Sequence, residues 1–296
     1  MRKFLLLSLA AFCIAALISY NYKQPAPPEP LSPECYVSCY NHVMEAFKAE
    51  ANTDMFASWH PNARKYQLVA DEGATILFDA PDGQQAQGWF LKSKKKSKNW
   101  IFVIQEWWGL NDNVKREALN IYKELGENVN ILALDMYDGK VAATPDSAMK
   151  LVRGAKTERL ENIIKGAIGH AGSKANIYTI GWCFGGMWSL QASLLAGNQA
   201  AGCVMFYGRP ENNIEKLKTL NCDVLGFFGN KDRSPSPEMV TKFEADMVTA
   251  GKKLTANKYE AGHGFANPSN PAYNKEATED AYKKVFAFYK EKMGLK

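Results

Sequence analysis

The chain alternates between short apolar runs and longer amphipathic segments. Apolar runs with the length and composition of buried β-strands lie at residues 100–104, 129–134, 175–180, 201–207, 224–228 and 255–259. Segments with apolar side chains at helical spacing lie at residues 114–125, 148–169, 237–250 and 277–292. Strands that alternate with helices predict an α/β fold, with a doubly wound, mostly parallel sheet covered by helices on both faces.

The first part of this pattern differs from the rest. Residues 74–78 and 87–91 predict an antiparallel pair of strands that turns about Asp82-Gly83. The lysine-rich residues 92–98 lie between two strand-like segments, and the simplest interpretation is a solvated hairpin loop.

The N-terminus predicts export. Basic residues 1–3 precede an apolar stretch at 4–18, which is shorter than the roughly 20 residues of a spanning helix. We interpret residues 1–19 as a signal peptide, or alternatively as an uncleaved signal anchor in the membrane. Residues 20–34 are rich in proline and predict an extended tether. The expected location is therefore extracytoplasmic, either periplasmic or secreted.

Residues 35–65 form an N-terminal extension. In an exported protein Cys35 and Cys39 could form a disulfide, which at this spacing requires a short non-helical loop. The alternatives are unpaired thiols, or metal ligation together with His42. Residues 43–49 predict a short helix.

Composition limits the classes of function. The 296 residues are 46% hydrophobic, so residues 66–296 can form one large domain. A net charge of +5, without a recognisable basic motif, gives no reason to expect nucleic-acid binding. The chain has no phosphate-binding glycine loop and no H-E-x-x-H or C-x-x-C pattern, so we expect no cofactor and no metal.

The strongest chemical signal is Gly181-Trp182-Cys183-Phe184-Gly185-Gly186. It follows an apolar run and precedes a helical stretch of small residues. This strand, G-x-C-x-G, helix arrangement is the nucleophile elbow of α/β-hydrolases, with cysteine in place of serine. The motif predicts that the side chain of Cys183 is presented above the ends of the strands.

Two later segments complete a set of catalytic residue types. Asp232 follows the apolar run at 224–228, and His263 lies between glycines after the run at 255–259. The order nucleophile, acid, histidine is that of α/β-hydrolases. A thiol attacks as the thiolate, an imidazole can take its proton, and a carboxylate can orient the imidazole.

With a fourth segment, residues 103–111 around Glu106, these motifs resemble the dienelactone hydrolase family (carboxymethylenebutenolidase-like) of the α/β-hydrolase superfamily. The resemblance covers roughly residues 66–296. It implies that Cys183 is the nucleophile, that His263 and Asp232 serve it, and that Glu106 lies beside the thiol and helps to govern its ionisation.

The same resemblance implies an oxyanion hole formed by the backbone N–H groups of Trp107 and Phe184. We expect an apolar substrate pocket near these positions, with Trp108, Trp182 and Tyr207 as candidate lining residues. Cys203 and Cys222 lie in or beside apolar runs and are expected to be core thiols, whereas His42, His60 and His170 are interpreted as structural or solvated.

The sequence departs from the family where substrate is held. Dienelactone hydrolases bind the substrate carboxylate with arginines, but residues 265–268 and 143–148 contain none. A neutral ester or lactone is therefore at least as good a candidate as the anionic dienelactone.

The leading hypothesis is a cysteine-dependent hydrolase of carboxylic esters or lactones that acts through a thioester acyl-enzyme. The alternatives are an extracytoplasmic binding protein with a degenerate hydrolase fold, or an acyltransferase or thiol peptidase that uses the same residues.

Overall fold

The computed structural model describes residues 33–61, 66–70 and 72–295, with side chains described from residue 42 onward. The chain divides into two units, residues 1–37 and 38–296, and the sheet and the candidate site lie in the second. The predictions for residues 1–19 and for most of the 20–34 tether lie outside the described residues. No helix within the described ranges is both long and apolar enough to cross a membrane.

The second unit contains an eight-stranded sheet in the order β1-β2-β4-β3-β5-β6-β7-β8. Its strands are β1 (Ala74–Asp79), β2 (Gln85–Leu91), β3 (Asn99–Ile104), β4 (Asn130–Leu134), β5 (Asn176–Trp182), β6 (Ala200–Phe206), β7 (Val224–Gly229) and β8 (Leu254–Tyr259). From β4 to β8 neighbouring strands are parallel, while β1 and β2 pair antiparallel. The predicted α/β fold is confirmed, and each central strand lies within a few residues of its predicted position.

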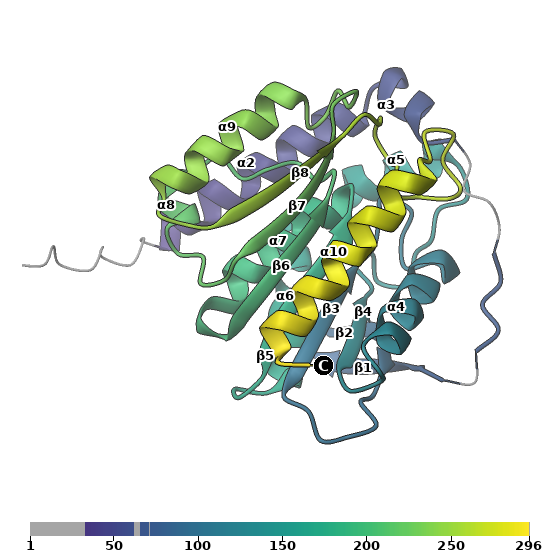
Figure 1. Cartoon of the computed structure of the whole chain (residues 1–296), viewed down its shortest axis with the longest axis vertical. Helices are drawn as coiled ribbons and strands as arrows, with labels where there is room; N and C mark the ends of the chain where they lie inside the picture. Colours follow the sequence, from purple (N-terminus) through teal and green to yellow (C-terminus); the bar gives the residue numbers. More distant parts are fainter. Residues whose placement is uncertain (1–32, 62–65, 71, 296) are drawn as a thin grey trace, which may run out of the picture. The chain divides into compact units, whose positions relative to one another are not determined.

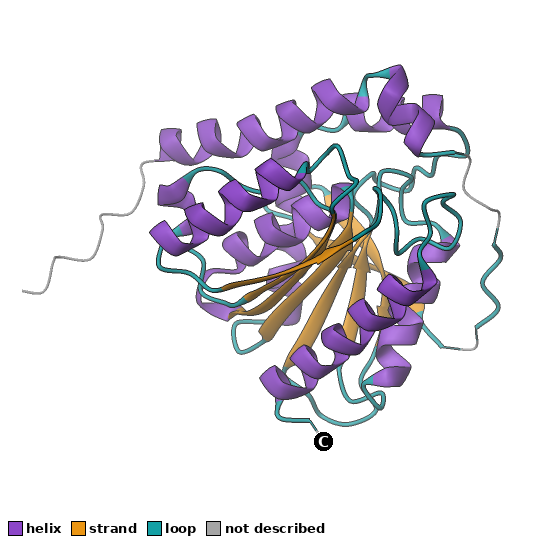
Figure 2. Ribbon diagram, turned by 45° about the horizontal axis from the view of Figure 1, so that its top comes forward, coloured by secondary structure: helices purple, strands orange, loops and turns teal. Residues whose placement is uncertain are grey.

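Helices cover both faces of this sheet (Figures 1 and 2). The helices α4 and α10 pack against one face, and α6 and α7 pack against the other. The helices that follow the first strands are α4 (Asp112–Glu124), α5 (Pro145–Gly154), α6 (Thr157–Ala171), α7 (Phe184–Ala196), α8 (Ile214–Leu217), α9 (Pro237–Thr249) and α10 (Lys275–Met293). Buried strands read as continuous apolar runs because helices cover them from both sides.

Two expectations about connections are wrong. The lysine-rich residues 92–98 do not form a hairpin, because β4 lies between β2 and β3 in the sheet. The loop crosses the start of β4, where the side chain of Asn130 accepts the N–H of Ser93 and donates to the carbonyl of Ser97. The single helix expected over residues 148–169 is two helices, α5 and α6, which are separated by extended backbone at Ala155 and Lys156.

The described part of the N-terminal extension is mostly helical. It contains α2 (Pro33–Ala51) and α3 (Asp54–Trp59), so the helix predicted at residues 43–49 is present but longer. The non-helical loop expected at Cys35 and Cys39 is wrong, because the backbone there belongs to α2. The condition set for a disulfide between them is therefore not met, and the pairing itself stays a prediction.

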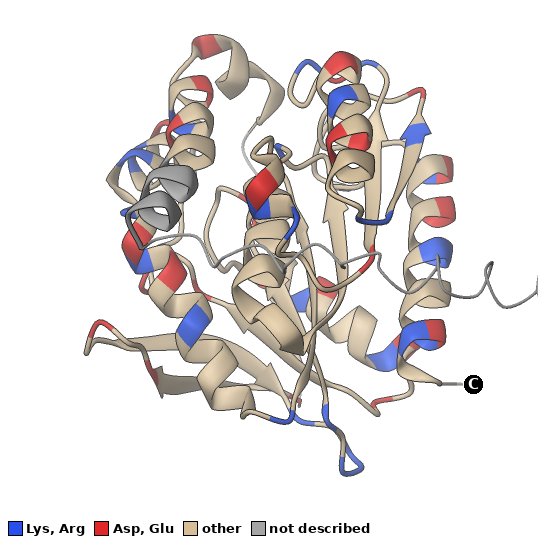
Figure 3. Cartoon of the chain, turned by 90° about the vertical axis from the view of Figure 1, so that its left-hand side faces the viewer, with Lys and Arg blue, Asp and Glu red and all other residues tan. Residues whose placement is uncertain are grey.

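In Figure 3, positions of basic and of acidic residues are both spread along the outer helices and loops, and few lie on the strands. Most helix-surface pairs are of the i,i+3 or i,i+4 type, such as Lys165 with Glu161 and Lys284 with Asp280. Pairs of this kind add little stability each and chiefly keep the surface solvated.

Candidate active site

The predicted catalytic residues gather at one edge of the sheet. Glu106 follows β3, Cys183 follows β5, Asp232 follows β7 and His263 follows β8. Because β3, β5, β6, β7 and β8 run parallel, their carboxyl ends lie at the same edge. Doubly wound sheets bind ligands at this edge, where the loops that follow the strands converge.

The turn that presents Cys183 is strained and glycine-dependent. Cys183 has φ 55° and ψ −117°, outside the conformations that side-chain-bearing residues usually adopt. A Cβ at Gly181 would lie 2.1 Å from the carbonyl oxygen of Gly185, and a Cβ at Gly185 would lie 2.2 Å from that of Ile104. Only glycine permits this approach of α7 to the strands, so the G-x-C-x-G motif acts here as an elbow.

His263 is oriented by Asp232. The Nδ1 atom of His263 lies 2.8 Å from Oδ2 of Asp232, and both side chains are buried. Because a carboxylate only accepts, Nδ1 carries the hydrogen and Nε2 faces the site. Burial lowers the pKa of His263, but Asp232 and Cys183 raise it, and the result lies well above its usual value. This histidine is therefore held ready to carry a proton.

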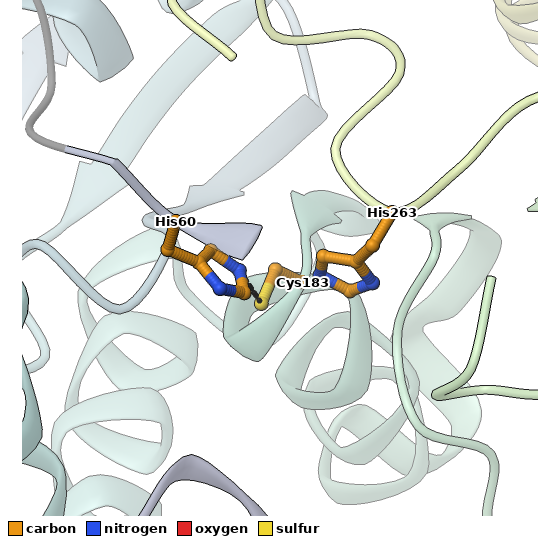
Figure 4. A group of neighbouring side chains, drawn as sticks. All are labelled: His60, Cys183 and His263. Atoms are coloured by element: carbon orange, nitrogen blue, oxygen red, sulfur yellow. Dashed lines mark hydrogen bonds between the residues drawn. The ribbon is translucent and has the colours of Figure 1, made fainter. Parts of the chain in front are cut away.

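The thiol of Cys183 lies between two histidines (Figure 4). Its Sγ atom and one ring nitrogen each of His60 and His263 all lie within 4.8 Å of one another. Sγ is 3.7 Å from Nε2 of His60, whereas Nε2 of His263 makes no hydrogen bond of good geometry. Burial raises the pKa of the thiol, and His263 acts in the opposite direction.

The position of His60 decides between the two interpretations made from the sequence, structural or solvated. His60 is 5% exposed, so it is not solvated, and it lies against the predicted nucleophile. No motif marks it, and it belongs to the extension that the family resemblance does not cover. A contact across 123 residues leaves no local pattern that could have revealed it.

Glu106, two residues after β3, is close enough to the thiol for its charge to act on Cys183. Its Oε2 accepts a hydrogen bond of 2.9 Å from the side chain of Asn267. Burial raises the pKa of Glu106 to about 7, although His263, Asn267 and Tyr207 act to lower it. Its charge also acts on Cys183, for which it raises the pKa. A carboxyl group that titrates near neutral pH beside a buried thiol can govern the ionisation of that thiol.

A cavity of about 40 Å³ opens beside Glu106. Its lining includes the three residues predicted for the substrate pocket, Trp108, Trp182 and Tyr207. Arg116 is the basic residue among the described lining residues, and its Nη2 lies 3.4 Å from Oε1 of Glu117, which also lines the cavity. The cavity therefore combines aromatic walls with one arginine and two carboxyl groups, those of Glu106 and Glu117.

Trp107, three residues after β3, and Phe184, the first residue of α7, are both fully buried. Their backbone N–H groups therefore belong to the two segments that meet at the elbow. The donor atoms of Cys183, His60 and His263 are also close enough to share a soft metal ion. A metal would occupy the lone pairs that a nucleophile and its base need, and the expected absence of a metal stays a prediction.

The fold and the elbow define an α/β-hydrolase. The sequence model of the dienelactone hydrolase family matches residues 87–293, more than half of the chain. The chain thus belongs to the dienelactone hydrolase family, and it is a hydrolase that acts on ester or lactone bonds. The family and the enzyme class predicted from the motifs are confirmed.

Relatives agree with this assignment. A protein of Saccharolobus solfataricus named "Putative carboxymethylenebutenolidase" is 27% identical over 253 residues, which cover 72% of this chain and 96% of the relative. The carboxymethylenebutenolidase of a Pseudomonas species is 26% identical over 139 residues, covering 45% of this chain and 57% of the relative. A dienelactone hydrolase-like promiscuous phosphotriesterase from metagenomic libraries superposes with a TM-score of 0.62 at 22% identity, covering 74% of this chain and 98% of that structure. At this identity the structural likeness concerns the fold.

Proposed function

We propose that this chain is a cysteine-dependent hydrolase of small, neutral carboxylic esters or lactones, with Cys183 as nucleophile, His263 as general base and acid, and Asp232 as the orienting carboxylate. The observation that carries the proposal is the placement of the Cys183 thiol within 4.8 Å of a ring nitrogen of His263, whose Nδ1 lies 2.8 Å from Asp232. Nucleophile, base and orienting group in this relation are the requirements for acyl transfer through a covalent intermediate.

In the acylation half-reaction, Nε2 of His263 takes the thiol proton and the sulfur attacks the substrate carbonyl carbon. The negative charge that develops on the carbonyl oxygen is stabilised by the backbone N–H groups of Trp107 and Phe184. The C–O bond then breaks, and the leaving alkoxide receives the proton from His263. In a lactone this alkoxide stays attached to the acyl group.

In the deacylation half-reaction, the thioester on Cys183 is attacked by water. His263 takes one proton from the water as the oxygen bonds to the acyl carbon, and it returns that proton to the departing sulfur. The products are a carboxylic acid and the regenerated thiol. Glu106 influences how readily the thiolate forms because its charge acts on the same buried site.

The lining of the cavity supports a neutral substrate. Aromatic side chains form much of its wall, and its basic residue, Arg116, is paired with Glu117. An anionic substrate would need a cation that is not already neutralised. The absence of arginine from residues 265–268 and 143–148 points the same way.

The test is hydrolysis of p-nitrophenyl acetate and of a small neutral lactone by the purified protein and three variants. Cys183→Ala should abolish turnover of both. His263→Ala and Asp232→Asn should lower kcat by about 10²–10⁴, because the base is lost or no longer held in the right tautomer. Cys222→Ala, which alters a cysteine outside the site, is the matched control and should retain full activity. Mass spectrometry should detect an acetyl group on Cys183.

Undiminished hydrolysis by Cys183→Ala would refute the proposal. Rapid alkylation of Cys183 without turnover of either compound would agree with the proposed role of Cys183 as nucleophile but would refute the proposed class of substrate. Slow alkylation and no turnover would instead favour a binding protein with a degenerate hydrolase fold.

We also propose that the hydrolase works outside the cytoplasm. The support is the sequence of residues 1–19, in which basic residues precede an apolar stretch. Fractionation of producing cells would place the protein in the periplasm or medium, on the membrane, or, against the proposal, in the cytoplasm.

A further inference from the structure

The N-terminal extension is an integral part of the wall around the thiol. The ring of Phe47 on α2 lies 5.7 Å from that of Phe184, the residue after the nucleophile. Phe47 also packs edge-on against Phe56 of α3, at 5.7 Å. Polar contacts reinforce this packing, because Arg209 pairs with Glu50 and the side chain of Asn270 donates to the carbonyl of Trp59. The extension therefore holds a defined position over the elbow.

His60 follows α3 directly, and its ring is fixed on three sides. It stacks on Phe56 with centroids 4.2 Å apart, lies 4.8 Å from Trp107, and lies 5.0 Å from the ring of His263. Its Nδ1 atom is 2.8 Å from the carbonyl oxygen of Phe56. Because a carbonyl only accepts, Nδ1 must carry the hydrogen.

The remaining nitrogen of His60 therefore presents a lone pair to the thiol. Burial, together with the neighbouring His263, lowers the pKa of His60 to about 3, so the ring is neutral under ordinary conditions. A neutral ring with its hydrogen on Nδ1 can only accept at Nε2. In the 3.7 Å contact between Sγ and Nε2 the donor must then be the S–H group of Cys183.

The two histidines thus differ in what they offer the nucleophile. In this structure the thiol contacts Nε2 of His60 at 3.7 Å, while Nε2 of His263 lies within 4.8 Å of the same sulfur without a hydrogen bond of good geometry. A thiol that donates to His60 is protonated, whereas attack requires the thiolate that His263 would produce. His60 therefore favours the protonated thiol, whereas His263 favours the thiolate.

We propose that His60 is a positioning residue, supplied by the N-terminal extension, which accepts a hydrogen bond from the Cys183 thiol and so favours the protonated thiol in its observed orientation. The proposal rests on the proposed role of Cys183 as nucleophile. The titratable groups that act on the thiol from the elements around it are His60, His263, Glu106, Tyr137 and Tyr207, with Asp232 behind His263.

The experiment measures the rate of Cys183 alkylation by iodoacetamide as a function of pH, in the presence of EDTA so that no bound metal interferes. Three substitutions separate the acceptor from the bulk of the ring. His60→Leu fills the space without an acceptor. His60→Asn can still donate to the carbonyl of Phe56 but ends short of the thiol. His60→Gln can place an oxygen near the former position of Nε2.

We expect the midpoint of the pH profile to fall by about one unit in His60→Leu and in His60→Asn, because the protonated thiol loses its acceptor. In His60→Gln the midpoint should stay close to that of the unaltered protein. The plateau rate at high pH reports access to the thiol, whereas the midpoint reports its ionisation. A merely structural role for His60 would move the plateau and leave the midpoints alike.

The proposal is overturned if all three variants keep the midpoint of the unaltered protein, or if His60→Gln shifts the midpoint as far as His60→Leu does. If His60→Leu does not fold, the comparison of Asn with Gln decides the question. His263→Ala should shift the midpoint of the pH profile in the opposite direction, to higher pH, because it removes a cation beside the thiolate. Alkylation needs no substrate, so failure of ester hydrolysis would refute the proposed function without altering this result.

Discussion

The chemistry of the site depends on which group each histidine meets at Nδ1. His263 meets the buried carboxylate of Asp232, which favours the protonated ring, while His60 meets a backbone carbonyl and remains neutral. The two rings are 5.0 Å apart, and a second imidazolium there would face the first in a buried space. Neighbouring titratable groups whose surroundings drive their pKa values apart can take different roles in one reaction. Here one histidine is suited to carry a proton and the other to accept a hydrogen bond.

Glu106 leads to a prediction about stability against pH. Its pKa is raised from 4.5 to about 7 in the folded protein, so the folded state holds this proton more tightly than the unfolded state. The resulting stabilisation is complete below the unfolded pKa and is lost as pH rises through the folded pKa. Because the side chain is only half-buried, we expect a loss of about 1–2 kcal/mol between about pH 5 and about pH 8.

Glu106→Gln should remove this pH dependence of the free energy of unfolding, as measured by urea denaturation across that range. Glu124→Gln, at an exposed position of α4, is the control and should follow the unaltered protein. Parallel curves for Glu106→Gln and the unaltered protein would contradict the assignment of a raised pKa to Glu106.

At the scale of elements, the elbow is a contact between backbones. The helix α7 begins directly after Cys183, and its first turn lies against the carboxyl end of β3. This closeness places Cys183 at the end of β5 and brings the segments of Trp107 and Phe184 together. A side chain at the crossing would force the helix away from the sheet.

Gly185→Ala should therefore destabilise the fold by about 3 kcal/mol or more. Its Cβ would lie 2.2 Å from the carbonyl oxygen of Ile104, and relieving this clash would require a shift of the backbone of α7 or of β3. The free energy of unfolding from urea titration measures the effect. Gly169→Ala on α6 is the matched control, because a Cβ there meets nothing within 4 Å. That substitution should stabilise the protein by up to about 1 kcal/mol. Equal effects at the two positions would disprove the close approach.

On the scale of the whole molecule, the extension and the hydrolase domain share one hydrophobic core. Val43, Met44, Phe47, Ala51 and Phe56 are buried in the same cluster as the strands β3 to β5. The boundary expected at residue 65 therefore does not separate two hydrophobic cores, because the extension and the hydrolase domain share one. Packing from α2 and α3 then couples the stability of the domain to the position of His60.

Phe47→Ala should test this coupling. Phe47 is 3% exposed and lies between Phe56 and Phe184, so its truncation should cost about 3–5 kcal/mol and loosen the elbow. Thermal or urea unfolding measures the loss, with Val248→Ala as control at a 77% exposed position of α9, where the change should stay within about 0.5 kcal/mol. If Phe47→Ala left stability unchanged, the extension would not belong to the core.

The sequence by itself determined the fold class, the order of the central strands along the chain, and the residue types at their ends. Each of these depends on local features: apolar runs for strands buried on both faces, and glycines at a crossing that excludes Cβ atoms. Cys183, Asp232 and His263 could be predicted because each follows such a strand within a few residues, whereas Glu106 was implied by the family resemblance. These signals need no knowledge of what packs against them.

Only the tertiary structure decided that β4 lies between β2 and β3, and that His60 lies against the thiol. Strand order, and a contact between residues 123 positions apart, depend on how distant segments pack against each other. The hydrophobic periodicity of one segment does not indicate which other segment it packs against. His60 has the local surroundings of an ordinary residue after a short helix. It becomes part of the site because the aromatic side chains of α2 and α3 bury themselves over the elbow.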